Sequence, residues 1–168
     1  MSSAILKITR TFNAPHDLVW ECWTDIRHVA KWLRPPGSKE KPDFQPKSDF
    51  RVGGQSLFCT VSPDGTEIYG LARYIEINPK DKVVYVHSFS DENANVCRNP
   101  MMPTWPLERL TTLIFVPEDD KTTVTLIWEP FNAPQEDIDT FVASLDGCAI
   151  GLKATFENLD RYLMEKQS

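Results

Sequence analysis

The carboxy-terminal part of the sequence carries one apolar stripe at helical spacing, and this stripe limits the folds open to the chain. Its apolar residues recur every three or four positions: Ile138, Phe141, Leu145, Cys148, Leu152, Phe156, Leu159 and Leu163. The spacing predicts one long helix with a single buried face, because residues three and four apart share one side of a helix. Such a helix needs a sheet or other helices to cover that face.

Two glycines interrupt the stripe. Gly147 and Gly151 lie four residues apart, and each costs up to about 1 kcal/mol of helix propensity relative to alanine. Three interpretations stay open: a close approach of the helix backbone to a sheet, room for a ligand, or a hinge or kink.

Ahead of this helix, the chain shows a series of strand patterns closed by turn-forming residues. The expected strands cover residues 5–12, 55–61, 68–77, 83–89, 110–116 and 122–128. Turn signals such as Pro63-Asp64-Gly65 and Asn78-Pro79-Lys80-Asp81 separate neighbouring strands. These signals predict antiparallel hairpins.

A helix, a kink and a second helix are expected between the first two strands. Pro15 suits the first turn of a helix, and Thr24-Asp25 offers a cap for a second short helix that Pro35-Pro36-Gly37 would end. The order of strand, helix pair, strands and long helix predicts an α+β fold with an antiparallel sheet covered on one face. At 168 residues, one domain spanning 1–168 is expected.

Composition excludes several classes of protein. A formal net charge of −6 argues against nucleic-acid binding, which needs clustered lysine and arginine. No run is apolar enough to span a bilayer and the amino terminus lacks a signal-peptide layout, so we expect a cytoplasmic protein. Cys22, Cys59, Cys97 and Cys148 are scattered, with no C-x-x-C pair and only three histidines in the chain. We therefore expect buried reduced thiols, no metal site and no cofactor.

Two blocks of sequence resemble a known superfamily. They are Ala14-Pro15 through Trp23-Thr24-Asp25 to Trp32, and Asp49-Phe50-Arg51-Val52-Gly53-Gly54. The chain resembles the START-like superfamily and, within it, the family named for activators of the ninety-kilodalton heat-shock chaperone. Matching positions run through nearly the whole chain. The resemblance implies a helix-grip fold, in which a strongly curved antiparallel sheet wraps around the long carboxy-terminal helix.

The resemblance implies three classes of function. Helix-grip proteins tend to leave a cavity between sheet and last helix, some relatives are aromatic polyketide cyclases, and the family name points to a co-chaperone. Chaperone activators that stimulate their partner carry a separate amino-terminal domain, whereas this chain begins directly with the START-like domain, so we do not expect a chaperone partner. Our main prediction is the binding of a small hydrophobic or amphipathic ligand.

The residues expected to line this cavity come from the strands, the long helix and the segment 90–108. They are Phe58, Val86, Leu113, Val124, Trp128, Phe141, Leu145, Cys148, Leu152, Met101 and Trp105. Each of them also suits an ordinary core position, and both interpretations stay open. The sequence does not show which side of the strand 55–61 faces inward, because Leu57, Cys59 and Val61 are as apolar as Phe58.

The segment 90–108 is too long for a plain hairpin and too apolar for a disordered linker. We interpret it as a lid, with Trp105 closing the cavity. Candidates for catalysis are sparse: His87 and Glu76 become a carboxylate-oriented general base only if the turn between their strands makes them cross-strand neighbours. A homodimer through the open sheet face or the Pro-rich loop is also compatible with the pattern.

Overall fold

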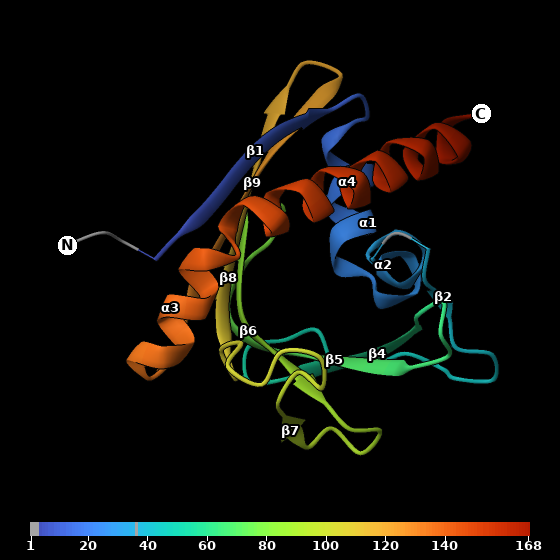
Figure 1. Cartoon of the computed structure of the whole chain (residues 1–168). Coiled ribbons are helices and arrows are strands. Elements are labelled where there is room, and N and C mark those ends of the chain that lie inside the picture. The colour runs from blue at the N-terminus through green and yellow to red at the C-terminus, as the bar shows by residue number, and fades with distance from the viewer. Residues whose placement is uncertain (1–3, 36) are drawn as a thin grey trace.

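The molecule is built around one curved antiparallel sheet whose concave side faces the helices (Figure 1). The computed structural model describes residues 4–35 and 37–168. Its elements in chain order are β1 (Leu6–Phe12), α1 (His16–Thr24), α2 (Ile26–Trp32), β2 (Lys39–Glu40), β3 (Lys47–Ser48), β4 (Gln55–Val61), β5 (Glu67–Asn78), β6 (Lys82–Ser90), β7 (Val96–Cys97), β8 (Arg109–Glu118), β9 (Lys121–Pro130), α3 (Gln135–Ala143) and α4 (Leu145–Gln167).

The strands form one nine-stranded sheet in the order β1-β9-β8-β6-β5-β4-β2, with β3 paired to β4 and β7 paired to β6. This arrangement confirms the predicted α+β, helix-grip class. All six predicted strands are present with ends within two residues of those expected. The sequence patterns missed β2, β3 and β7, because two residues are too few to show an alternation.

The helix pair α1–α2 is held at its kink by Asp25. The Asp25 carboxylate accepts a hydrogen bond of 3.0 Å from the Arg27 backbone N–H, which confirms Asp25 as the cap of α2. Pro15 lies one residue earlier than expected, as the residue before α1. Helix α2 ends at Trp32, ahead of the predicted stop, in which Pro36 lies outside the described residues.

The single long helix predicted at the carboxy terminus is instead two helices. Ser144 interrupts it, and its hydroxyl donates to the Thr140 carbonyl at 2.8 Å, a local bond that competes with helix continuation. Helix α3 therefore turns away from the axis of α4 (Figure 1). An added Cβ at Gly147 or Gly151 would meet no heavy atom within 4 Å, so the first of the three interpretations, a close backbone approach at these glycines, is wrong.

The core fills the space between the concave sheet face and the helices. Its most enclosed members include Phe12, Val19, Trp32, Phe141 and Leu159. A second, smaller cluster lies elsewhere on the sheet and consists of Leu57, Cys59, Tyr69 and Leu71, with Phe44 and Ala94 packed against it. Strand β4 is therefore largely buried on both faces, with Leu57 and Cys59 on one and Ser56, Phe58 and Thr60 on the other, which explains the ambiguous parity of its sequence.

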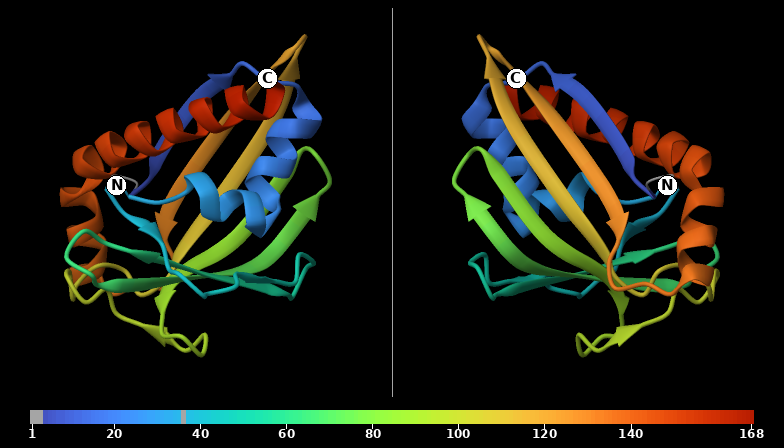
Figure 2. Two further views of the ribbon diagram at one scale, coloured as in Figure 1. Left: turned by 90° about the vertical axis from the view of Figure 1, so that its right-hand side faces the viewer. Right: turned by 90° about the vertical axis from the view of Figure 1, so that its left-hand side faces the viewer.

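The convex side of the sheet is open around β8 and β9. Figure 2 shows these strands with no helix across them in the part of the chain that the structure describes. The helices thus lie on one side only, and the candidate site belongs to the concave side.

Candidate functional site

A small cavity lies inside the molecule between the sheet and the helix pair. Its volume is about 40 Å³. The residues that line it are Trp23, Thr24, Ile26, Val29, Leu33, Phe50, Ser56, Phe58, Ala72, Tyr74, Val83, Tyr85, His87 and Leu113. Since one water needs roughly 10–15 Å³, the cavity holds only a few water-sized groups, whereas typical ligand pockets measure about 300–1,000 Å³.

The predicted lining residues divide into three groups. Phe58 and Leu113 line this cavity together with the candidate His87. Seven other predicted residues belong to the core beside the cavity and do not line it. Four of them are buried, Trp105, Val124, Phe141 and Leu152, and three are half-buried against this core, Trp128, Leu145 and Cys148. Helix α4 contributes no lining residue, so the cavity lies against the helix pair and not, as expected, under α4.

Val86 and Met101 lie elsewhere. Tyr85 and His87 line the cavity, and because successive strand residues point to opposite faces, Val86 faces the other side of the sheet. Met101 is 73% exposed in the connection between β7 and β8. The parity of β6 and the path of this connection correct the expectation for both residues.

The hypothetical pair of His87 and Glu76 does not form. In the β5–β6 hairpin, His87 is opposite Ala72 and Glu76 is opposite Val84, with an irregularity in register after Tyr74. Glu76 instead lies 3.4 Å from the Lys82 ammonium. The register that the hairpin adopts keeps the carboxylate away from the imidazole.

The connection between β6 and β8, expected to be a lid, is docked on α3. Arg98 forms an ion pair of 2.5 Å with Asp137, and the hydroxyls of Thr104 and Thr140 are 2.7 Å apart. The Trp105 ring packs against Phe141 with centroids 5.6 Å apart. Trp105 thus belongs to the core under α3 and does not line the cavity.

Arg109 is the functional candidate that the sequence reasoning missed. It is the first residue of β8 and only 6% exposed, and its guanidinium donates a hydrogen bond of 2.5 Å to His87 Nδ1. The guanidinium also lies over the rings of Trp128 and Trp105, at 4.1 and 5.3 Å from their centroids. Burial lowers the pKa of Arg109 to about 10, so the group stays charged at neutral pH.

His87 is held in its neutral form. Burial, followed by the Arg109 charge, places its pKa well below the usual 6.5. Because a guanidinium can only donate, Nδ1 of His87 accepts and Nε2 carries the ring proton. Its alternation with Val83 and Tyr85 along β6 is a sequence signal for this inward position, and the expectation of an inward Val86 overlooked it.

A further donor of the interior is the indole of Trp23. Its Nε1 is buried and has no hydrogen-bond partner among the described residues. Burial raises the pKa of Tyr85 to about 12, which keeps its phenol protonated. The interior therefore presents hydrogen-bond donors and one cation in an aromatic surrounding.

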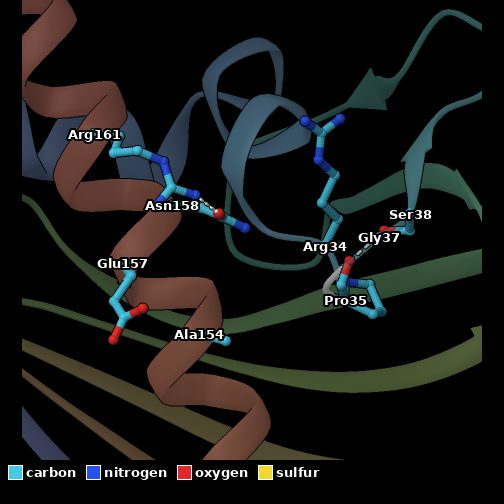
Figure 3. Close-up of a pocket in the computed structure, with 8 residues that line it drawn as sticks. All are labelled: Arg34, Pro35, Gly37, Ser38, Ala154, Glu157, Asn158 and Arg161. Carbon is cyan, nitrogen blue, oxygen red and sulfur yellow. Dashed lines mark hydrogen bonds between the residues drawn. The ribbon is translucent and has the colours of Figure 1, made fainter.

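A second hollow lies outside the core, between α4 and the loop after α2 (Figure 3). It has a volume of about 360 Å³ and is lined by Arg34, Pro35, Gly37, Ser38, Ala154, Glu157, Asn158 and Arg161. Arg161 donates to Asn158, and the Ser38 hydroxyl donates to the Pro35 carbonyl at 2.6 Å. The hollow is a polar surface groove, in which the side chains of Arg34 and Glu157 form no hydrogen bond or ion pair with the described residues.

Three side chains at the kink of the helix pair have the composition of a metal site. The ligand atoms of Glu21, Asp25 and His28 lie within 4.8 Å of one another. Each has a protein partner: His28 is 2.6 Å from the Tyr162 hydroxyl and 3.0 Å from Glu21, and Asp25 binds Arg27. These contacts account for the cluster as part of the helix packing. Among the cysteines, Cys97 is exposed, which corrects the expectation that all four are buried.

A comparison with models of protein families identifies the family of the chain. Residues 13–164 match the model of the family described as Activator of Hsp90 ATPase homolog 1-like protein. The chain belongs to this family. The membership confirms the resemblance to the START-like superfamily, and the match extends over the helix pair, the sheet except β1, and most of α4.

Solved structures share the fold of this family member. A protein of Arthrobacter aurescens matches with a TM-score of 0.75 at 25% identity, over 97% of this chain and 87% of the other. A Mycobacterium smegmatis protein gives 0.73 at 22%, over 96% and 91%, and a Nitrosomonas europaea protein gives 0.75 at 17%, over 99% of both chains. No curated protein matches the chain. Within the described residues, no helix combines the length and apolar character needed to cross a bilayer.

Proposed function

We propose that this protein binds a small apolar or amphipathic molecule on the concave side of its sheet, at the cavity beside the helix pair. The observation that carries the proposal is Trp23, which lines the cavity while its indole N–H is buried without an acceptor in residues 4–35 and 37–168. Unpaired buried donors are rare in proteins, and a polar group of a ligand would satisfy this one. Aromatic walls with few polar groups are typical of small-molecule sites.

The volume of the cavity sets a condition on this function. A cavity of about 40 Å³ admits only a small part of an ordinary ligand. Binding therefore requires the wall to move outward, and the wall of the cavity opposite the sheet is the helix pair. Such side-chain and loop rearrangements on binding are common.

A thermal-shift screen of apolar and amphipathic compounds tests the proposal. A ligand at a hundredfold excess over its dissociation constant stabilises the native state by about 2.7 kcal/mol. We expect the shift to be lost in Ala72→Leu, which fills the cavity, and kept in Ala154→Leu, which fills the outer groove. Far-ultraviolet circular dichroism checks that both variants fold.

The opposite pattern, with the shift lost only in Ala154→Leu, would assign binding to the groove and contradict the proposal. A screen in which no compound raises the midpoint would favour a protein partner instead. The family description points to a chaperone ATPase in that case, and the readout would be the rate of ATP hydrolysis by the chaperone.

A further inference from the structure

Arg109 is a buried cation with no counter-ion in the part of the chain that the structure describes. Its side chain enters the interior from β8, and its one hydrogen bond among the described residues goes to the neutral imidazole of His87. The other arginines of the neighbourhood have acidic partners: Arg73 pairs with Glu108, and Arg98 pairs with Asp137. A buried charge is costly unless an opposite charge compensates it, so the arrangement calls for an anion.

The groups around the guanidinium do not supply that anion. Trp128 and Trp105 offer ring faces, which attract the cation but do not neutralise it. Tyr85 and Cys148 are near enough to influence the charge of Arg109, yet burial raises the pKa of each and keeps both protonated. His87 gives its only acceptor to Arg109.

The donors nearby point to an oxyanion as the missing partner. His87 carries its proton on Nε2, and this N–H has no acceptor in the described part of the chain. A guanidinium presents its N–H groups as a planar fork that fits the two oxygens of a carboxylate.

We propose that the ligand of this protein carries a carboxylate, that Arg109 binds this carboxylate, and that His87 both orients Arg109 and adds a donor. The proposal rests on the proposed function and names the chemical class of its ligand: an aromatic or alkyl carboxylic acid. Its apolar part would occupy the cavity that His87, Phe58 and Leu113 line.

The experiment compares carboxylic acids with their primary amides, which have nearly the same shape and no charge. The probes are indole-3-acetate, 4-phenylbutanoate and octanoate, each measured beside its amide by isothermal titration calorimetry at pH 7. We expect the acid of the best pair to bind at least about tenfold more tightly than its amide, since a charge-assisted pair in a buried site is strong.

Arg109→Gln should reduce this preference to about twofold or less, because glutamine keeps a donor for His87 and removes the charge. The matched control is Arg73→Gln on β5, whose arginine pairs with Glu108 and is 45% exposed; it should leave the preference unchanged. Equal affinities for acid and amide in the wild type, or a preference that survives Arg109→Gln, would overturn the carboxylate proposal and leave the proposed function standing.

Absence of binding by every acid and every amide would overturn both proposals. If Arg109→Gln fails to fold, nuclear magnetic resonance of the wild type gives the answer. The side-chain signals of Arg109 Nε and of the His87 ring should shift on addition of the acid and stay in place with the amide. Identical shifts with both compounds would contradict the carboxylate proposal.

Discussion

Trp32 connects the two helices of the helix pair through one hydrogen bond. Its indole N–H donates to the Cys22 carbonyl at 2.8 Å, and its side chain is fully buried against Trp23. Cys22 lies in the last turn of α1, where carbonyls have no partner within the helix. At the scale of the residue, Trp32 therefore serves as packing for α2 and as a cap for α1.

Trp32→Phe tests this double role. The substitution leaves the Cys22 carbonyl buried without a partner, which costs about 1–3 kcal/mol in free energy of unfolding, and the smaller ring adds a cavity penalty. Urea denaturation measures the loss. The matched control is Trp20→Phe, because Trp20 packs edge-on against Phe50 and Phe115 and is only half-buried. An equal loss in the two variants would contradict the capping role.

At the scale of the element, α4 differs from an ordinary core helix at its amino-terminal end. Ser144 separates it from α3, and Gly147 and Gly151 follow within two turns. The space around both glycines is open, so these residues are not required for packing against the sheet. Two of the sequence-based interpretations of the glycines stay open: room for a ligand, and a hinge. Each gives the glycines a role in binding or in movement of the helix.

Gly147→Ala and Gly151→Ala are each expected to increase the free energy of unfolding by about 0.5–1 kcal/mol. Alanine has the higher helix propensity, and its Cβ meets no neighbour at either position. Urea denaturation of the two variants gives the result. A decrease in stability would show that the helix comes closer to the sheet in solution. A stabilised variant with weaker ligand binding would indicate that the glycines keep space for the ligand.

At the scale of the whole molecule, most charged groups lie at the surface, whereas Arg109 is buried beside the neutral His87. The surface ion pairs, such as Arg27 with Asp25 and Lys80 with Asp17, contribute little because solvent screens them. Arg109 is buried, and His87 lies beside it at the cavity. Folding lowers the pKa of His87, so protonation of this side chain is coupled to the free energy of unfolding. We therefore expect mild acid to lower the free energy of unfolding through protonation of His87.

The stability of the protein should decrease as the pH falls below about 6.5. The unfolded chain binds a proton at His87 near that pH, while the folded chain does not, because the folded pKa is lowered. The slope contributed by this one group is at most about 1.4 kcal/mol per pH unit. The aspartates with lowered pKa, such as Asp25 and Asp64, begin to lose their stabilising contribution only below about pH 5, and they are the same in the wild type and in a His87 variant.

Chemical denaturation between pH 6.5 and 4.5 measures the slope, with His87→Gln as the control. Glutamine keeps an acceptor for Arg109 but does not titrate, and His16 and His28 are the same in both proteins. The wild type should therefore lose more stability over this range than the variant. Parallel curves for the two proteins would contradict a neutral buried His87.

Much of the fold could be predicted from local patterns. Alternation predicted the six long strands, and apolar spacing predicted the helix pair and the carboxy-terminal helical region, because these patterns record which residues are buried. For the candidate site, Phe58 and Leu113 were expected in the cavity and do line it, although the sequence left the inward face of strand 55–61 open. The expectation failed for Val86, since both faces of β6 are largely buried there and the sequence does not show which of them faces the helices.

The sequence by itself thus determined the fold class, the elements and most of the core, which follow from interactions between residues close in the chain. Tertiary structure alone decided the site. The contact of Arg109 with His87 depends on the register of β6 and β8 across a connection of nearly twenty residues. The helices that border the cavity are α1 and α2, and their position depends on how this pair packs against the sheet. Contacts between distant segments set both features, and such contacts leave no periodic signal in the sequence.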